Sequence, residues 1–303
     1  PALSQANIGV AMGNTGTDVA RDASDMVLQD DDFSNIVSAV EEGRKLYLNI
    51  RNFVRYQIST NFSAVLLIVI TPFLFGWELP LTVTQLLVIN ILMDGPPAVA
   101  LGIEKRHSDV MNEPPRELDE SLPNASDRSV ILMLGIVMFL GTAAVFWFSG
   151  GGIITSDEPC TEFDGSIEEN YLDENGYCVV EAWESDAHDR FVKAQTMAFS
   201  VFVLFQLFNV LNCRSTDRSI FELGLFNNQA ITASFVISAS LLLFFVQGAY
   251  LSIPFVGIEI GELLSVVPLE TNDWLIVFAT ASSVFFFDEG RKLIQRSSKD
   301  SRR

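Results

Sequence analysis

Long runs of apolar residues alternate with polar connections along most of the chain, and this pattern predicts membrane-spanning helices. Six runs come close to the roughly 20 residues that a helix needs to cross a bilayer, and the last run is the shortest. They are Phe53–Gly76, Leu79–Gly102, Ser129–Ser149, Thr196–Cys213, Ile231–Leu251 and Trp274–Phe287. We therefore expect a mainly α fold, with a six-helix transmembrane bundle embedded in a lipid bilayer.

Residues 1–50 follow a different pattern, in which short apolar runs alternate with turn and cap signals. The run Ile8–Met12 predicts a buried strand, Thr17–Ser24 a helix, and Met26–Leu28 a second strand. Such an α/β segment is too short to fold alone. We therefore divide the chain into residues 1–50 and a membrane domain of residues 51–303. The acidic run Asp30–Asp32 favours an N-terminal cap of the next helix over a metal site.

The distribution of Lys and Arg predicts the orientation of the spans, because cytoplasmic connections carry an excess of basic residues. Basic residues precede the first span, follow the sixth, and lie in the second and fourth connections, whereas the long acidic loop 150–190 is almost free of them. Arg190 and Lys193, just before the fourth span, are exceptions. We expect both termini on the cytoplasmic side of an integral membrane protein.

The acidic composition and the start of the chain each add one expectation. The chain of 303 residues has 38 Asp and Glu against 19 Lys and Arg. Such acidity excludes a nucleic-acid partner, which would need a basic face. The chain begins at Pro1 and shows no signal peptide, so we expect it to be the C-terminal part of a longer protein.

One carboxylate stands in the middle of an apolar span. Asp94 follows Leu86–Met93 and precedes Gly95, Pro96 and Pro97. A charged side chain at mid-membrane costs roughly 2.5–3.5 kcal/mol on insertion scales, so it is rarely retained without a use. Asn90 lies one helical turn earlier and is expected to share a face with Asp94. The prolines break the helix and leave backbone carbonyls without donors. Together these oxygens favour a site for a hard cation, and the alternative is a polar pair that packs helices.

The cysteines agree with the predicted orientation. Cys160 and Cys178 both fall in the acidic outer loop, where an oxidising compartment would allow a disulfide between them. The alternative is two free thiols. Cys213 is expected at the inner membrane edge as a small apolar residue.

Eight segments of the chain carry a resemblance to a known family. They are Pro1–Leu3, Ile8–Gly13, Ala23–Leu28, Val40–Arg44, Phe53–Ser59, Asn90–Ala98, Cys213–Ser215 and Ser219–Glu222. These segments resemble P-type cation ATPases. The beginning of the chain resembles the end of their HAD-like phosphorylation domain, and the segment before the first span resembles the stalk that leads into their fifth membrane helix. Asn90–Ala98 is similar to the sixth helix of calcium pumps, and its form with Met93 and Gly95–Pro97 most resembles the secretory-pathway Ca²⁺/Mn²⁺ pumps.

The resemblance covers nearly the whole chain and implies that residues 1–50 are a remnant of the phosphorylation domain with its stalk. It also implies an ATP-driven pump in which the six spans are the last six membrane helices. The resemblance places the phosphorylated Asp, the nucleotide domain and the first four membrane helices outside this chain. ATP and Mg²⁺ would therefore be bound by the intact protein. The chain alone therefore contains no catalytic residue.

The family's ion ligands can be carried over position by position. Two-ion calcium pumps have an Asn and a Glu in the first of these spans, where this chain has Asn61 and Ala64. In the next span, Met93 stands where those pumps have a Thr. In the fourth span, Gln206 stands where they have a Glu. Since one ion site thus lacks its ligands, the resemblance implies a single divalent ion per cycle.

Asn90 and Asp94 are the retained ligands of the other site, and Asn61 and Gln206 are weaker candidates. Chemistry alone leaves Asn61 and Gln206 open as interhelical hydrogen-bonding residues. Met93 could tolerate Mn²⁺ nearby, but a packing role is favoured.

The resulting prediction is the membrane half of a divalent cation pump that moves Ca²⁺, or Mn²⁺, out of the cytoplasm. The alternatives are a P-type pump for Na⁺ or H⁺ and a non-catalytic, truncated membrane protein. The expected location is the plasma membrane in a prokaryote or a secretory-pathway membrane in a eukaryote.

Overall fold

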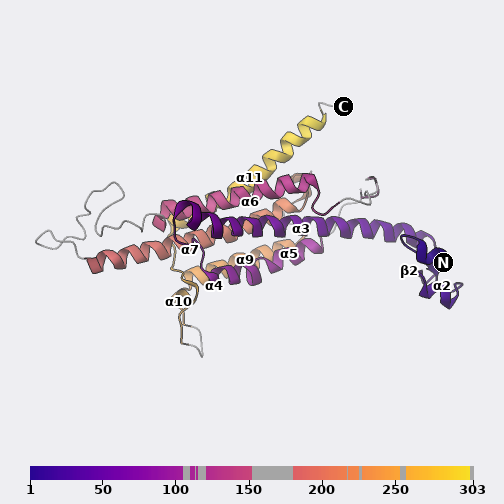
Figure 1. Cartoon of the computed structure of the whole chain (residues 1–303), viewed down its shortest axis with the longest axis horizontal. Coiled ribbons are helices and arrows are strands. Elements are labelled where there is room, and N and C mark those ends of the chain that lie inside the picture. The colour runs from indigo at the N-terminus through magenta and orange to yellow at the C-terminus, as the bar shows by residue number, and fades with distance from the viewer. Residues whose placement is uncertain are drawn as a thin grey trace, which may run out of the picture. The chain divides into compact units, whose positions relative to one another are not determined.

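The computed structural model describes residues 1–104, 110–112, 114, 121–151, 180–216, 218–224, 227–252 and 257–300. It divides into two compact units, of which one is Pro1–Asn49 with Arg106–Leu118 and the other is Ile50–Lys105 with Asp119–Arg303. A single long helix, α3 (Ser34–Phe75), contributes residues to both units (Figure 1). Much of the predicted outer loop, including Cys160 and Cys178, lies outside the described residues.

The first unit has a small α/β arrangement. Its elements are α1 (Ala2–Gln5), β1 (Val10–Met12), α2 (Asp18–Asp22) and β2 (Met26–Leu28), followed by the start of α3 and the short 3₁₀ helix η2 (Val110–Asn112). The two strands pair in parallel with Val10 opposite Met26, and α2 connects them. The two strands and the helix lie where the sequence predicts them.

Gly13 allows the chain to turn closely at the end of β1. A Cβ at this position would lie 2.7 Å from the backbone oxygen of Leu28, well inside contact distance. Only glycine therefore fits without displacing β2.

The acidic run Asp30–Asp32 binds backbone amides. Asp32 Oδ1 accepts the N–H of Ser34, the first residue of α3, at 2.9 Å, so the prediction of a helix cap is confirmed for this residue. Asp31 instead accepts the N–H groups of Asn14 and Thr15, each at 2.9 Å. The Asn14 N–H has the larger effect in lowering the pKa of Asp31 below its usual value. These carboxylates therefore fix the start of α3 and the turn after β1.

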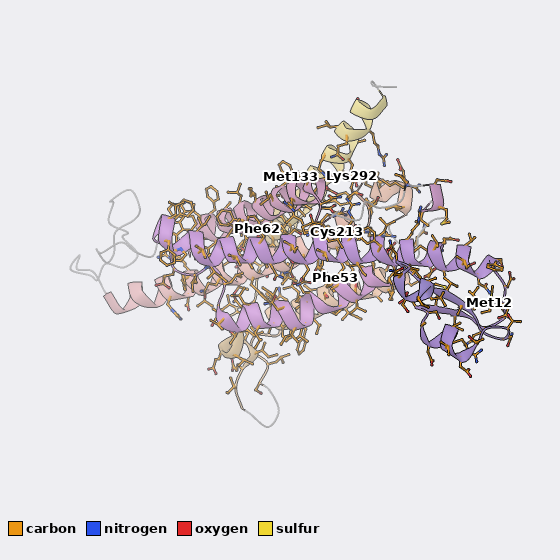
Figure 2. All side chains as sticks on the ribbon, turned by 45° about the vertical axis from the view of Figure 1, so that its right-hand side comes forward. Met12, Phe53, Phe62, Met133, Cys213 and Lys292 are labelled. Atoms are coloured by element: carbon orange, nitrogen blue, oxygen red, sulfur yellow. The ribbon has the colours of Figure 1, made fainter. Side chains whose placement is uncertain are left out.

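The second unit is a bundle of helices. It contains the rest of α3, then α4 (Val83–Val88), η1 (Ile89–Met93), α5 (Gly95–Gly102), α6 (Ala125–Phe146), η3 (Trp147–Gly151), α7 (Val180–Cys213), α8 (Ile220–Leu223), α9 (Gln229–Gln247), α10 (Ile260–Leu264) and α11 (Thr271–Asp300). Apolar side chains cover these helices along most of their length (Figure 2).

Helix α7 forms the centre of the bundle. In its most apolar window, 94% of the residues are buried, compared with 28% in α3 and in α9. Helices α6, α9 and α11 pack against it. A helix that is apolar on all sides is typical of a buried position, whereas the helices around it leave large apolar side chains exposed.

Within the described residues, five stretches of helix are long and apolar enough to cross a membrane, and they correspond to the first five predicted spans. They are Ser34–Phe75, Val83–Gly102, Ala125–Gly151, His188–Cys213 and Gln229–Gln247. The sixth predicted span lies in α11 and is not one of these five, because its apolar run Trp274–Phe287 is short and is bounded by Asp273 and Asp288. The count of six spans therefore stays a prediction. Helix α11 nevertheless packs against α6 and α7, with Val277, Ala281 and Val284 fully buried.

Candidate functional site

The second predicted span is not one continuous α-helix. Thr82 caps α4 through a reciprocal pair of hydrogen bonds with Gln85, and α4 ends at Val88. The following turn, Ile89–Met93, is π-helical, with the N–H of Asp94 bonded to the carbonyl of Ile89 at 2.9 Å. Asp94 is then the N-terminal cap residue of α5, which has proline in its first turn. Proline is tolerated there because the first N–H groups of a helix have no partner within it.

Pro97 also leaves one backbone carbonyl without its usual helical donor. Because Pro97 has no N–H, the carbonyl of Met93 lacks its α-helical donor. The hydroxyl of Ser238 on α9 lies 3.5 Å from this carbonyl oxygen and donates to it. An oxygen with a weak donor therefore lies beside Asp94, at the junction of η1 and α5.

Asp94 itself is buried, with 2% of its surface exposed. The hydroxyl of Tyr56, on α3, donates to Asp94 Oδ1 at 2.8 Å. Asp94 Oδ2 is buried and has no hydrogen-bond partner within the described part of the chain. A buried carboxylate oxygen without a donor is costly, so it marks a place where a ligand or water would gain binding energy.

The other candidate ligands make no hydrogen bond to Asp94 among the described residues. Asn61 and Asn90 are both exposed on the described bundle. Gln206 is buried on α7, and its Oε1 has no hydrogen-bond partner within the part of the chain that the structure describes. The residue that the structure adds to the candidate site is Tyr56, which the sequence did not single out.

Met93 is a packing residue in this arrangement. Its side chain is 1% exposed and belongs to the main apolar core. The packing interpretation from the sequence is therefore supported over a ligand role for its sulfur.

Polar contacts attach α3 to α7 along the length that carries Tyr56. Asn52 donates to the carbonyl of Arg214 at 2.9 Å, and Arg55 donates to the carbonyl of Cys213 at 2.9 Å. One turn further along α3, the hydroxyl of Ser59 accepts from Asn209 at 2.8 Å. The order of these pairs shows that α3 and α7 run antiparallel, so the side chain of Tyr56 is held by contacts on both sides of it.

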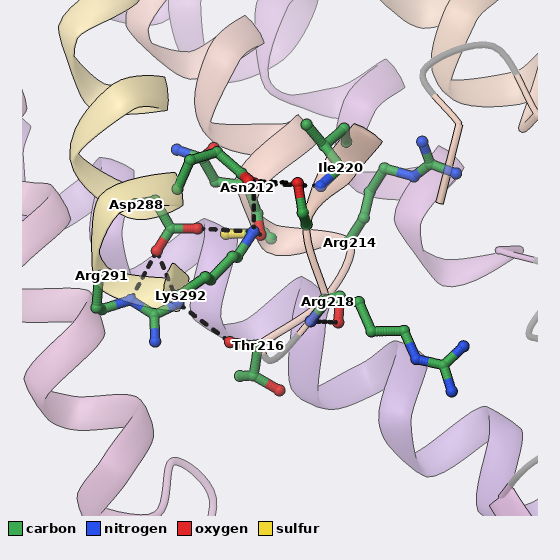
Figure 3. A network of polar contacts seen from close by, with 12 residues as sticks. Asn212, Arg214, Thr216, Arg218, Ile220, Asp288, Arg291 and Lys292 are labelled. Carbon is green, nitrogen blue, oxygen red and sulfur yellow. Dashed lines mark hydrogen bonds and ion pairs between the residues drawn. The ribbon is translucent and has the colours of Figure 1, made fainter. Parts of the chain in front are cut away.

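A network of buried charges lies at the C-terminal end of α7, close to the contacts of Asn52 and Arg55 (Figure 3). Lys292 on α11 is 1% exposed and binds Asp288 at 2.9 Å, Glu289 at 3.3 Å and the carbonyl of Asn212 at 3.3 Å. Glu289 also accepts the hydroxyl of Ser219 and the N–H of Ile220. These contacts join α11 to the connection between α7 and α8. Since each charge has an opposite partner, the network is structural.

A second charged contact joins α3 to the start of α6. Arg51 binds the buried Asp127 at 2.7 Å, and Arg55 lies 3.9 Å from the same carboxylate. The first turn of α6 is capped by Asn124, which accepts the N–H of Asp127. Asp94 is therefore distinct among the buried carboxylates described, because no basic side chain pairs with it.

A buried carboxylate at a helix break can bind a hard cation, although it supplies only part of a site. Ca²⁺ takes six to eight oxygen ligands, and Asp94 with nearby carbonyls provides a minority of them. Among the described residues, no group of three or more His, Cys, Asp or Glu could hold a metal. The described bundle is thus that of a helical membrane protein, and Asp94 is its candidate ligand for a cation.

Comparison with known families identifies the class more closely. The family model described as cation transporting ATPase, C-terminus, matches residues 78–294. The chain belongs to this family.

Individual relatives are calcium pumps by name. The chain is 38% identical over 295 residues to calcium-transporting ATPase type 2C member 2 of Rattus norvegicus, which covers 97% of this chain and 27% of the relative. It is 35% identical over 297 residues to calcium-transporting ATPase 1 of Yarrowia lipolytica, covering 98% of this chain and 27% of that protein. The similarity to calcium-transporting ATPase 1 of Saccharomyces cerevisiae is 36% over 300 residues, with coverages of 99% and 27%. The chain thus spans about a quarter of the length of these relatives.

Proposed function

We propose that this chain is the C-terminal membrane part of a P-type ATPase that pumps Ca²⁺ out of the cytoplasm, with Asp94 as an ion ligand. Membership of the cation-transporting ATPase family supports the class of protein, and the names of the relatives support Ca²⁺ as the ion. In the intact protein, the remainder would bind ATP and Mg²⁺ and carry the phosphorylated Asp. Both termini of this chain would lie on the cytoplasmic side of the membrane.

The observation that carries the proposal is the environment of Asp94. The side chain is buried in a stretch apolar enough to cross a membrane, and no basic residue among those described pairs with it. Within the same described residues, its Oδ2 has no hydrogen-bond partner. An ionised carboxylate in such surroundings is strongly stabilised by a divalent cation, whose charge would offset the cost of burial.

The remaining ligands would come from η1, from α3 and from the part of the pump outside this chain. Asn61 and Asn90 are exposed on the bundle, so their amide oxygens are free to contribute to a site shared with the rest of the pump. Gln206 is buried on α7 and is a weaker candidate; like the two asparagines, it would offer a neutral amide oxygen. Asp94 is the single Asp or Glu within the six predicted spans, which agrees with one divalent ion per cycle. Mn²⁺ is a second candidate ion, since it also accepts oxygen ligands.

The substitution Asp94→Asn tests the assignment in the full-length pump. Asparagine has nearly the same size and keeps one oxygen, so the helix break and the contact with Tyr56 can persist. Losing one partner of a buried charge pair costs about 3–5 kcal/mol. Each 1.4 kcal/mol is about tenfold in affinity, so we expect a loss on the order of a thousandfold.

The measurement is the Ca²⁺ concentration that gives half-maximal phosphorylation by ATP. Phosphorylation by inorganic phosphate without Ca²⁺ should remain, because it does not need an occupied ion site. Glu78→Gln is the matched control, since Glu78 is an exposed carboxylate between α3 and α4. If Asp94→Asn responds to Ca²⁺ like the wild type, Asp94 is a packing residue and the proposed function of this site is wrong.

A further inference from the structure

The proposed ion ligand, Asp94, has a buried neighbour, Tyr56, to which the proposed function gives no role. Tyr56 is 0% exposed, and its hydroxyl donates to Asp94 Oδ1 at 2.8 Å. The bond joins two different helices, because Tyr56 lies on α3 and Asp94 lies at the start of α5. Gln57, the next residue of α3, is the second side chain that interacts with Asp94.

Tyr56 is held more firmly than the carboxylate that it contacts. Its backbone carbonyl accepts the hydroxyl groups of Ser59 at 2.9 Å and of Thr60 at 3.2 Å. The preceding residue, Arg55, is anchored to the carbonyl of Cys213, and Ser59 is bonded to Asn209. Asp94, in contrast, follows a π-helical turn and makes no side-chain cap bond to α5. The tyrosine is therefore the fixed partner in this pair, and the aspartate is the one that is oriented.

We infer that Tyr56 is a positioning residue, which orients Asp94 so that Oδ2 faces the cation while Oδ1 is held by the phenol. This inference rests on the proposed function of Asp94 as an ion ligand. Hydrogen bonds to ligating carboxylates fix their direction, and removing such a partner typically costs about 10- to 100-fold in metal affinity. The unpartnered Oδ2 is the oxygen left for the ion.

The substitution Tyr56→Phe in the full-length pump removes the hydroxyl and keeps the buried ring. We expect the Ca²⁺ concentration for half-maximal phosphorylation by ATP to rise about 10- to 100-fold. The maximal phosphoenzyme level and phosphorylation by inorganic phosphate without Ca²⁺ should be unchanged. A merely structural role would reduce the amount of active pump and leave the half-maximal concentration where it was.

Two further variants complete the test. Tyr250→Phe is the matched control, because Tyr250 is 73% exposed, and it should behave like the wild type. Tyr56→Met removes the hydroxyl with a flexible side chain that can fill the same space, so it covers the case in which the phenylalanine variant folds poorly. The same shift in Ca²⁺ concentration is expected from it.

Parallel measurement of Asp94→Asn separates the two hypotheses. If Asp94→Asn loses Ca²⁺ affinity but the Tyr56 variants keep it within about twofold, the positioning role is overturned and the ligand assignment stands. If Asp94→Asn keeps wild-type affinity, the ligand assignment fails and the positioning role fails with it. A shift in both Asp94→Asn and Tyr56→Phe, with normal maximal phosphorylation in the latter, supports both.

Discussion

Gly141 on α6 lies where three helices meet, and the substitution Gly141→Ala tests this packing. A Cβ at residue 141 would lie 2.5 Å from Cζ of Phe205 on α7 and 3.3 Å from Cγ2 of Thr280 on α11. Phe205 is 0% exposed, so its ring has no free space into which to withdraw. Adding a methyl group to a tightly packed core of this kind typically costs about 1–3 kcal/mol.

The helix propensity of alanine works in the opposite direction and must be separated from the packing cost. Replacing glycine by alanine inside a helix stabilises it by roughly 0.5–1 kcal/mol. Gly290 on α11 offers a matched control, because a Cβ there would meet nothing within 4 Å. Gly290→Ala should therefore show the propensity gain alone, and the difference between the two variants gives the packing term of about 1–3 kcal/mol.

Thermal unfolding of the purified full-length protein, followed by tryptophan fluorescence, measures this difference. One kcal/mol corresponds to about 2–4 °C for a domain of 150–250 residues, so Gly141→Ala should unfold several degrees below Gly290→Ala. Adding Phe205→Leu should reduce the cost of Gly141→Ala, because residues in contact do not contribute additively. If both glycine variants unfold at the same temperature, α6 does not approach α7 as the structure describes.

Two further predictions concern the transported ion and the outer loop. Equilibrium binding of radioactive Ca²⁺ to the intact pump should give one ion per phosphoenzyme, because Ala64, Met93 and Gln206 stand where two-ion pumps have oxygen ligands; a ratio of two would contradict this. Cys160 and Cys178 should form a disulfide in the native protein, so neither should react with an alkylating reagent until a reductant is added. Recovery of both as alkylated peptides without reductant would argue for free thiols.

The apolar runs of the sequence predicted where most helices lie, but not where they begin and end. Helix α6 begins at Ala125, four residues before the predicted Ser129, because Asn124 caps it and the charged first turn belongs to the helix. Helix α11 continues to Asp300, beyond the predicted end at Phe287. Its charged end is held by Lys292, which donates to a carbonyl near the end of α7, and by Glu289, which accepts the first N–H of α8. Hydropathy detects the part of a helix that contacts lipid or core and misses the rest.

The candidate site was predictable only in part. Asp94 could be found from the sequence, since a carboxylate in an apolar run is unusual wherever it folds. Tyr56 could not, because it lies 38 positions away and a tyrosine in a span has no comparable signal. The expected pairing of Asn90 with Asp94 assumed regular α-helical spacing, and the chain between them is π-helical. Here the observed backbone, rather than the residue type, decides which side chains meet.

The two kinds of interface in the bundle suggest why the ion ligand is linked to α3 in particular. Helices α6, α7 and α11 interlock through fully buried apolar side chains, and such packing resists small displacements. Helix α3 is attached to α7 through the polar contacts of Asn52, Arg55 and Ser59. These contacts fix Tyr56 relative to the end of α7, so the position of Tyr56 follows from how α3 sits against α7. A displacement of α3 against α7 would therefore carry Tyr56, and with it the orientation of Asp94.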